Sequence, residues 1–349
     1  MNIMTIIGAR PQFIKAAAVS RAIRAYNESN TTQIEEKIIH TGQHFDANMS
    51  KIFFSELDIP QADYNLAIAG LAHGAMTGRM MESIESILKQ EQPDIVLVYG
   101  DTNSTLAGAL TAKKMHIKVA HVEAGLRSFN MAMPEEINRI LTDRISELLF
   151  CPTDIAVQNL QKEGFDLMDN QVIKCGDVMQ DAALFYKQRA QAIILKDIPE
   201  KFILVTVHRA ENTDNIKRLK QIVQAFNELS KTINIVMPLH PRTKKIIEEN
   251  KLVINFQTIA PVGYLEMLSL LEKCKFVMTD SGGLQKEAFF FEKNCITLRD
   301  ETEWLELVDN GYNVLVGADK NKIRESVDNI VGMNHCFNLD LYGSGKATD

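Results

Sequence analysis

The sequence predicts an α/β fold with two doubly wound domains that face each other across a cleft, and three observations support it. The chain has 349 residues, more than a single hydrophobic core usually holds and enough for two domains of ordinary size. Short apolar runs alternate with segments of helical length, which is typical of parallel sheets with helical crossovers. The alternation pauses near residue 175 and then starts again, so we expect domains at residues 1–175 and 176–349.

The first domain is expected to be Rossmann-like, with strands buried on both faces of the sheet. Its apolar runs lack a strict alternation of apolar and polar residues, which indicates that neither face meets water. The expected strands are Ile3–Ile7, Lys37–His40, Ile95–Tyr99, Val119–Val122, Leu148–Phe150 and Val172–Lys174. The expected helices are Pro11–Tyr26, Met76–Gln90, Ser104–Met115, Glu135–Glu147 and Asp154–Glu163.

The second domain repeats the architecture without a detectable sequence repeat. Its expected strands, with helices between them, are Phe202–Val207, Ile233–Leu239, Phe256–Ile259, Phe276–Thr279 and Cys295–Leu298. The segment Met179–Glu200 has a polar end with Pro199 and is interpreted as the connection between the domains. The tail Tyr342–Asp349 is small and polar, so we expect it to fray.

Composition excludes several classes of function. The net charge of −7 argues against a nucleic-acid binder, which needs a surplus of lysine and arginine to displace counterions. A small anionic ligand stays possible, because its site needs only a few local donors. The N-terminus has neither a basic region nor a long apolar run, so we expect no signal peptide. No apolar run approaches the ~20 residues of a membrane span, and we therefore expect a cytoplasmic protein that does not enter membranes.

The cysteines and histidines give no sign of a metal site. The five cysteines form no Cys-x-x-Cys pair and are interpreted as reduced structural thiols. The eight histidines form no His-Glu-x-x-His motif or other metal-binding spacing. We therefore expect no structural metal.

Ligands of open α/β sheets bind at the carboxyl ends of the strands, so the residues after each strand are the first candidates. After the first strand, Gly8 permits a sharp turn and Pro11 can start a helix. Arg10 and Lys15 place two cations near that helix N-terminus, where the dipole favours an anion. A solvated basic face beside a structural turn explains the spacing equally well. The segment is not a Gly-x-Gly-x-x-Gly loop, so it lacks the nicotinamide fingerprint.

Three carboxylates follow neighbouring elements of the first domain. Asp101 follows Ile95–Tyr99, Glu123 follows Val119–Val122, and Glu135 opens a helix just after Pro134. Considered alone, Asp101 could serve as a helix N-cap, and Glu135 could interact favourably with the helix dipole. Together at one edge of a sheet, like charges raise at least one pKa, which proton transfer needs. The group therefore favours acid–base chemistry.

The second domain offers groups for a nucleotide. His208 and Arg209 follow Phe202–Val207, although a lone histidine is more often a satisfied core residue. Ser281, Gly282 and Gly283 open a helix after Phe276–Thr279, where bare backbone N–H groups suit a phosphate. The alternative for the two glycines is a tight turn. Glu287, one turn further on, could accept hydrogen bonds from a ribose diol.

Six motifs in this order resemble the non-hydrolysing UDP-N-acetylglucosamine 2-epimerase family. Each is weak alone, but the ordered set is highly specific and spans about residue 3 to about residue 317. The motifs are Gly8-Ala9-Arg10-Pro11, Gly100-Asp101-Thr102, His121-Val122-Glu123-Ala124-Gly125-Leu126-Arg127, Pro134-Glu135-Glu136-Ile137-Asn138-Arg139, His208-Arg209-Ala210-Glu211-Asn212 and Asp280-Ser281-Gly282-Gly283-Leu284-Gln285-Lys286-Glu287.

The resemblance implies a fold like that of the B-type glycosyltransferases (GT-B-like), commonly as a homodimer, with a UDP-sugar as substrate and no cofactor. It implies that UDP binds mainly to the second domain. It also implies that the C2 proton is removed while UDP leaves C1, that a 2-acetamidoglucal forms, and that UDP returns with a proton added to the opposite face. Such chemistry needs more than one carboxylate, because two faces of the sugar are served. It also gains from positive groups that stabilise the departing diphosphate.

The resemblance also assigns roles by position. The acid/base carboxylates are matched by Asp101, Glu123 and Glu135, and the histidine near the leaving UDP is matched by His208, with Arg209 beside it. First-domain substrate contacts are matched by Arg10 and Lys15. UDP contacts are matched by Ser281, Gly282, Gly283 and Glu287.

Three departures point to a branch that acts on modified sugars, such as UDP-2,3-diacetamido-glucuronate. The stretch between Glu123 and Glu135 is about two residues shorter than in common members. The family's Thr-Thr-Glu-Arg is replaced by Glu301-Thr302-Glu303-Trp304, which removes a basic residue. Gln43-His44 matches part of a segment linked in some members to activation by substrate, but the next residues differ. Rival interpretations are a hydrolysing epimerase that releases UDP, a glycosyltransferase of the same fold and a catalytically inactive nucleotide-sugar sensor.

Overall fold

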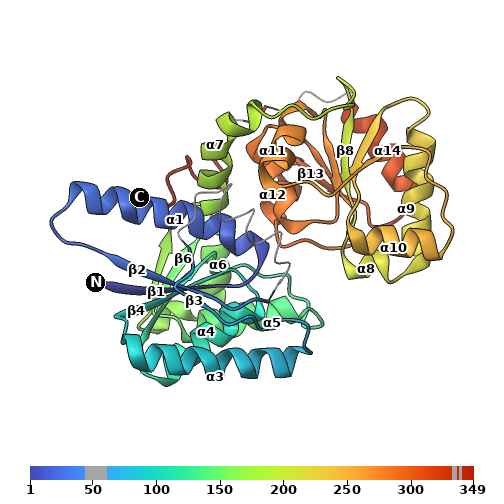
Figure 1. The fold of residues 1–349 in the computed structure, drawn as a ribbon. Coiled ribbons are helices and arrows are strands. Elements are labelled where there is room, and N and C mark those ends of the chain that lie inside the picture. The colour runs from blue at the N-terminus through green and yellow to red at the C-terminus, as the bar shows by residue number, and fades with distance from the viewer. Residues whose placement is uncertain (44–60, 332–335, 338–339) are drawn as a thin grey trace. The chain divides into compact units, whose positions relative to one another are not determined.

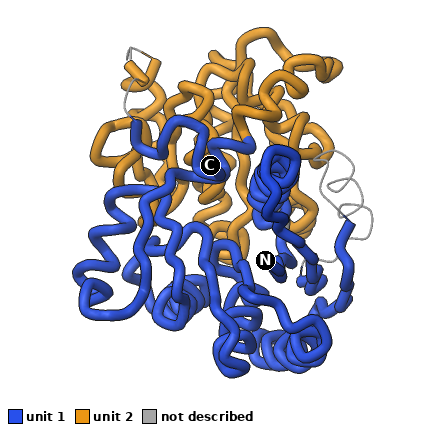
Figure 2. The backbone as a smooth tube through the Cα atoms, turned by 90° about the vertical axis from the view of Figure 1, so that its left-hand side faces the viewer, with its two compact units in different colours: residues 1–182, 340–349 blue, residues 183–339 orange. Residues whose placement is uncertain are grey.

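The computed structural model describes residues 1–43, 61–331, 336–337 and 340–349 of the chain. Two compact units make up the structure: residues 1–182 with 340–349 form unit 1, and residues 183–339 form unit 2. Figure 1 shows the elements and Figure 2 shows which segments belong to each unit.

Unit 1 is a parallel sheet with helices on both faces. Among the described residues the sheet has seven strands in the order β3-β2-β1-β4-β5-β6-β7. The strands are β1 (Asn2–Ile7), β2 (Glu35–His40), β3 (Tyr64–Asn65), β4 (Ile95–Tyr99), β5 (Lys118–Val122), β6 (Leu148–Cys151) and β7 (Gln171–Lys174). The helices are α1 (Arg10–Ser29), α3 (His73–Glu91), α4 (Asn103–Lys114), α5 (Pro134–Ile145), α6 (Asp154–Lys162), the 3-10 turn η1 (Phe165–Leu167) and the first part of α7 (Val178–Gln191). Helices α1 and α3 lie on opposite sides of the sheet (Figure 1).

An apolar stripe on α3 shows why this helix packs against the sheet. Met76, Met80, Ile84 and Leu88 recur every four residues and are all buried, as expected for one face of an amphipathic helix. They belong to the cluster that also contains the strand residues Met4, Ile6, Val96 and Val98. Each such side chain contributes about 1.5–3 kcal/mol on burial, so the central strands of the sheet are held firmly.

Unit 2 repeats this plan. Its sheet has, in the described part of the chain, six parallel strands in the order β10-β9-β8-β11-β12-β13. The strands are β8 (Ile203–Thr206), β9 (Ile235–Pro238), β10 (Gln257–Ile259), β11 (Val277–Thr279), β12 (Cys295–Thr297) and β13 (Asn313–Leu315). The helices are the rest of α7, α8 (Ala210–Thr213), α9 (Ile216–Leu229), α10 (Pro241–Glu249), α11 (Tyr264–Lys273), α12 (Gly282–Phe290), α13 (Leu305–Asp309) and α14 (Lys320–Val331).

Both sheets follow the order that defines a doubly wound Rossmann-like domain. Numbered within each unit, the strands run 3-2-1-4-5-6, with one further strand in unit 1. All strand pairs are parallel, for example β1 with β4 and β8 with β11. The predicted fold class, α/β with two doubly wound sheets, is therefore confirmed.

The division between the units differs from the expected one at residue 175. Helix α7 runs through the segment expected as a connection, and the chain divides after Ala182. Residues 340–349 were expected in the second domain, but they pack with unit 1. Asp177 N donates to Tyr342 O (2.8 Å), and Thr348 N donates to Asp181 Oδ2 (3.0 Å). Because Tyr342 is only 1% exposed, the expectation of a frayed tail was wrong.

None of the described helices has the length and apolar character needed to cross a membrane.

Candidate active site

The candidate residues follow the strands at which each sheet changes direction. In unit 1 the strand order reverses between β1 and β4, and in unit 2 it reverses between β8 and β11. Ligands of doubly wound sheets bind outside the carboxyl ends of the strands at such a point. Gly8 follows β1 and Asp101 follows β4, while His208 follows β8 and Ser281 follows β11. Sequence position and sheet topology therefore indicate the same edge in each unit.

Glu123 stands at the end of β5 in a backbone conformation that is rare for its residue type. Its φ is +72°, in the left-handed region, which costs a residue other than glycine about 1–2 kcal/mol. Its carboxylate forms an ion pair with Lys15 Nζ of α1, and the two side chains are 9% and 7% exposed. A Cβ built on neighbouring Gly100 would lie 3.2 Å from both charged groups. Lys15, predicted to contact substrate, thus lies against Glu123 beside the β4 turn.

Asp101 is held by groups from α5. Its Oδ2 accepts a hydrogen bond from Arg139 Nη2 (2.6 Å), and its backbone O accepts from Asn138 Nδ2 (2.8 Å). The Asp101 side chain is still 30% exposed. The alternative that Asp101 caps the next helix was wrong. Helix α4 starts at Asn103, and its N-cap is Thr102, whose side chain accepts from Thr105 N.

Glu136 anchors the other side of Arg139. Arg139 Nη1 donates to Glu136 Oε2 (2.8 Å), and Glu136 also accepts from the backbone N–H groups of Ser128 and Phe129 (both 2.9 Å). Burial raises the pKa of Glu136, but these hydrogen bonds and the arginine charge outweigh it, so the pKa is lowered overall. A fixed negative charge at Glu136 therefore holds the guanidinium that orients Asp101.

Glu135 lies beside this group, in the first turn of α5, and its side chain is exposed. Asp101 and Glu123 each have a cation against them, so the unpaired like charges expected from the sequence are partly offset. The catalytic role of Glu135 stays a prediction.

The turn after β1 is shaped by close packing. A Cβ on Gly8 would lie 2.0 Å from Thr41 Oγ1 and 2.3 Å from Ser104 Oγ, so only glycine fits. Gln12 Oε1 accepts from the N–H groups of both Gly8 and Ala9 (2.8 and 3.0 Å). These two donors are therefore occupied within the protein, which weakens the interpretation of this turn as an anion site.

Two further predicted residues lie near this turn. Arg10 is the first residue of α1, but its side chain lies outside the described part of the structure. Gln43 Oε1 accepts from Ser104 N and Oγ (3.0 and 2.8 Å). His44, expected beside it, also lies outside the described residues.

In unit 2 a buried carboxylate, Asp280, organises the loop after β8. Asp280 is 0% exposed and accepts hydrogen bonds from His208 N (3.1 and 3.0 Å), Arg209 N (3.0 Å) and Asn212 Nδ2 (3.2 Å). The His208 side chain is 38% exposed, so the alternative of a satisfied core histidine was wrong. Asp280 thereby joins the ends of β8 and β11 and holds His208 and Arg209 at that edge.

The Ser281–Gly283 segment opens α12 directly after Asp280. Ser281 is the N-cap of the helix. Neither Gly282 nor Gly283 has a positive φ, so the tight-turn alternative is not what requires glycine. A Cβ on Gly282 would lie 2.6 Å from Glu303 Oε1, whereas a Cβ on Gly283 would meet no described atom within 4 Å. Gly282 therefore serves close packing, and Gly283 presents open backbone.

A second cluster of buried charged side chains lies at the start of α12. Arg299 Nη1 donates to Glu303 Oε2 (2.8 Å), and Arg209 Nη2 lies 3.9 Å from Glu303 Oε1. Trp304 Nε1 donates to Gly282 O (3.0 Å), and Lys286 Nζ lies 4.0 Å from the centre of the Trp304 ring. The residue that departs from the family pattern, Trp304, thus fastens the first turn of α12. Glu287, further along α12, is 6% exposed.

Sequence reasoning missed several of these residues. Asp280, Glu303 and Arg139 were read only as members of motifs. Glu135 and Arg139 are four residues apart on α5 and so share a helix face, a signal that could have placed Arg139 near the carboxylates. No comparable signal exists for the pairing of Lys15 with Glu123, which depends on a contact between α1 and the end of β5.

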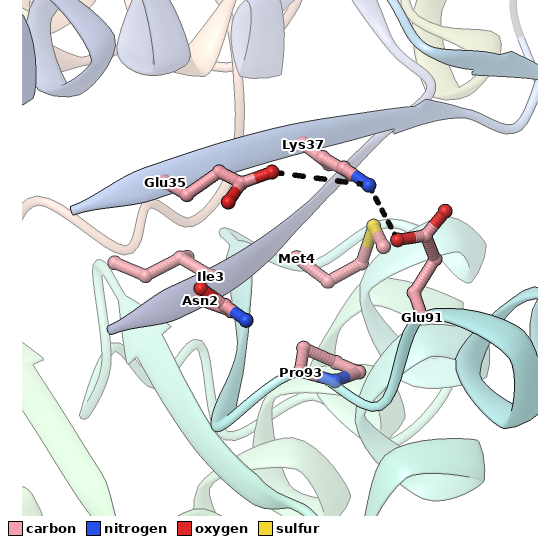
Figure 3. Close-up of a pocket in the computed structure, with 7 residues that line it drawn as sticks. All are labelled: Asn2, Ile3, Met4, Glu35, Lys37, Glu91 and Pro93. Atoms are coloured by element: carbon pink, nitrogen blue, oxygen red, sulfur yellow. Dashed lines mark hydrogen bonds and ion pairs between the residues drawn. The ribbon is translucent and has the colours of Figure 1, made fainter.

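One concave place lies away from this edge. The pocket in Figure 3 lies at the opposite, amino-terminal end of β1 and β2, where Lys37 Nζ pairs with Glu91 Oε2 (2.6 Å) and Pro93 closes one side. Within the described residues, no group of three or more His, Cys, Asp or Glu side chains could hold a metal ion.

Two parallel sheets of Rossmann order, each with polar and charged residues at its switch point, define a two-domain Rossmann-like α/β protein. The sequence model of one family, UDP-N-acetylglucosamine 2-epimerase, matches residues 27–349. The chain belongs to this family, so the resemblance seen in its motifs is confirmed.

Individual relatives cover almost the whole chain. A UDP-2,3-diacetamido-2,3-dideoxy-D-glucuronate 2-epimerase of Pseudomonas aeruginosa is 57% identical, over 100% of this chain and 97% of its own length. The UDP-N-acetylglucosamine 2-epimerase of Methanocaldococcus jannaschii is 44% identical, over 99% and 96%. The crystal structure of that archaeal protein with UDP-GlcNAc and UDP matches with a TM-score of 0.91, over 100% and 97%. The Neisseria meningitidis enzyme bound to UDP-GlcNAc matches with a TM-score of 0.86 at 33% identity, over the same shares.

Proposed function

We propose that this protein inverts C2 of a UDP-linked 2-acetamido sugar by eliminating UDP and adding it back, without a cofactor. The observation that carries the proposal is the pair of carboxylates, Asp101 and Glu123, at the carboxyl edge of β4 and β5, each set against its own cation. Because the chain belongs to the 2-epimerase family, we interpret these two carboxylates as acid/base groups.

Each step of the proposed reaction has a group to perform it. A carboxylate takes the proton from C2, the C2–H electrons form a C1=C2 double bond, and the C1–O bond breaks so that UDP leaves with its electron pair. The return reaction adds UDP to C1 while another carboxylate protonates C2 on the opposite face. Asp101, Glu123 and Glu135 are the candidates for proton transfer. Arg209 and His208 are the candidates that stabilise the diphosphate as its charge grows.

Within this class, we propose a 2,3-diacetamido uronate linked to UDP as the preferred substrate. The support is comparative: identity is 57% to the relative named for that sugar and 44% to a relative named for UDP-N-acetylglucosamine. Both sugars carry an acetamido group at C2, the carbon whose configuration the reaction inverts. The cytoplasmic location and the homodimer expected from the sequence belong to the same proposal, and sedimentation of the purified protein tests the dimer.

Epimerisation in deuterated water should introduce deuterium at C2, because the carboxylate that protonates C2 carries a proton that has exchanged with solvent. The purified protein should do this without an added cofactor, on UDP-2,3-diacetamido-2,3-dideoxy-glucuronate or UDP-N-acetylglucosamine. Proton NMR and mass spectrometry of the product measure the exchange. Retention of the original hydrogen would mean oxidation elsewhere on the ring. Free UDP formed in step with free sugar would identify the rival hydrolysing reaction.

Gly283→Val and Glu287→Ala should each weaken UDP binding by roughly 1–3 kcal/mol, the usual scale for a hydrogen bond lost at a buried or charged site. Valine would cover the open backbone at the start of α12, and alanine would remove the expected ribose acceptor. Titration calorimetry with UDP measures both effects. Gly282 is unsuitable for this test, since a Cβ there meets Glu303 at 2.6 Å.

Gly74→Val is the matched control for this pair. Gly74 is the second residue of α3, as Gly283 is of α12, and a Cβ there also meets no described atom within 4 Å. The control should bind UDP as the parent does. Unchanged affinity in both test variants would move the nucleotide away from α12.

A further inference from the structure

A buried network of charges lies directly behind the carboxylate edge of unit 1. His121 of β5 is 0% exposed; its Nδ1 lies 2.7 Å from Asp143 Oδ1 and its Nε2 lies 2.7 Å from Gly100 O. Asp143 Oδ2 accepts from Gly125 N (3.1 Å) and from Arg127 Nη1 (2.7 Å). Arg127 in turn donates two hydrogen bonds to Glu163 (2.7 and 2.8 Å).

The geometry fixes the direction of one hydrogen bond of His121. A carbonyl oxygen only accepts hydrogen bonds, so Nε2, which faces Gly100 O, is the donor. The other ring nitrogen, Nδ1, faces Asp143 Oδ1. Burial raises the pKa of Asp143, but its bonds and charge interactions with His121 and Arg127 outweigh burial and lower the pKa overall. Arg127 forms ion pairs with both Asp143 and Glu163.

The network joins the three elements that carry the candidate acid/base groups. Through Gly100 O it holds the turn that leads from β4 to Asp101, and through Gly125 N it holds the turn two residues after Glu123. Asp143 itself belongs to α5, whose first turn contains Glu135. Gly100, Glu123 and Gly125 all have positive φ, at +61°, +72° and +80°. Glycine adopts such a conformation freely, but at Glu123 it persists only where the surroundings over-determine it.

We infer that His121, with Asp143, is a positioning residue that sets the geometry of Asp101 and Glu123 for proton transfer at C2. This inference rests on the proposed function. Stability alone would be served as well by packed apolar side chains, since buried charges pay a desolvation cost that such side chains avoid. The charged network adds orientation, because two of its hydrogen bonds end on backbone atoms next to the carboxylates, Gly100 O and Gly125 N. The described bonds of the network join residues of unit 1, so nucleotide binding to unit 2 should not depend on it.

His121→Leu should lower kcat by about 10²-fold, since a misplacement of about 1 Å has that effect on a positioned group. The KM for the UDP-sugar that the parent protein converts should change by less than about threefold, and calorimetric UDP affinity should not change. His121→Gln keeps an amide donor for Gly100 O, and His121→Asn keeps one for Asp143. Both should recover part of the lost kcat, and the glutamine variant should recover more, because Gly100 adjoins Asp101.

His40→Leu is the matched control, since His40 is also buried, at 2% exposed, but lies on β2, and the centre of its ring is 5.1 Å from that of Phe13. It should lower stability and leave kcat near the parent value. Equal losses of kcat at positions 40 and 121, or full activity in His121→Leu, would overturn the inference. So would a loss of UDP affinity in a folded His121→Leu protein, which would indicate a general structural role.

Nitrogen-15 NMR of the imidazole ring tests the premise without any turnover. Nε2 of His121 should carry a proton that is hydrogen-bonded to Gly100 O, and an unprotonated Nε2 would overturn the inference even in an active enzyme. If instead the parent protein converts no UDP-sugar while this hydrogen bond is present, the proposed function fails and the network geometry stands.

Discussion

Replacing Glu123 by glutamine should lower kcat by about 10²- to 10⁴-fold, the usual scale for losing a positioned acid or base. Glutamine keeps the size of the side chain and a hydrogen-bond acceptor for Lys15, but it cannot take or deliver a proton at C2. Asp101→Asn should have an effect of the same order, with Arg139 still able to donate to the remaining carbonyl oxygen. UDP affinity should be unchanged in both variants, because these groups are proposed to act on the sugar. Steady-state kinetics and calorimetry measure the two properties.

The chain offers a close control for Glu123→Gln at the other end of the same sheet. Glu91 also pairs with a lysine, Lys37, at 2.6 Å, and its side chain is 15% exposed (Figure 3). Glu91→Gln removes a carboxylate from an ion pair that lies away from the carboxyl ends of the strands. The variant should keep kcat within about twofold of the parent value. Near-normal turnover in both Glu123→Gln and Asp101→Asn would contradict the acid/base role and indicate that these two residues are structural.

The sequence was informative where a pattern is local. The strands at the sheet centres are continuous apolar runs, so Ile95–Tyr99 was predicted with the bounds that β4 has. Two edge strands, β3 and β13, were missed, and β3 has only two residues, too few to show a periodicity. The segment Met179–Glu200 was expected to connect the domains, and the chain divides within it, but the helix α7 that covers its first part was not predicted. The buried face of this helix includes Tyr186. Tertiary packing of that face decides its conformation.

In the candidate site, too, some features could be predicted from the sequence and others could not. Residues directly after strands, such as Asp101 and Ser281, could be predicted, since the carboxyl edge of a parallel sheet is a known place for ligands. Their partners could not be predicted, because each contact joins segments far apart in the chain. Lys15 meets Glu123 across 108 positions, and Asp280 meets His208 across 72. The N-cap interpretation of Asp101 failed for a local reason: Thr102 is one residue closer to the helix and takes that role.

The contacts of Asp280 lead to a prediction about stability. Asp280→Ala should lower the free energy of unfolding of unit 2 by about 2–4 kcal/mol, because it leaves His208 N, Arg209 N and Asn212 Nδ2 without their buried acceptor. Asp280→Asn keeps one acceptor oxygen and should cost about half as much. The single tryptophan, Trp304, is buried in unit 2, so its fluorescence during urea unfolding reports on this unit.

The same substitution should reduce UDP binding, which separates a role at the site from a role in stability alone. Once the loop after β8 loses Asp280, Arg209 is no longer held beside the start of α12, and UDP affinity should fall at least tenfold in protein that is still folded. Asp319→Ala is the matched control: its exposed carboxylate accepts from Asn321 N and Lys322 N (2.8 and 3.0 Å) at the start of α14. The control should lose about 1 kcal/mol of stability, as for a helix cap, and keep its UDP affinity. Parent-like UDP affinity in Asp280→Ala would mean that the loop carrying His208 and Arg209 takes no part in nucleotide binding.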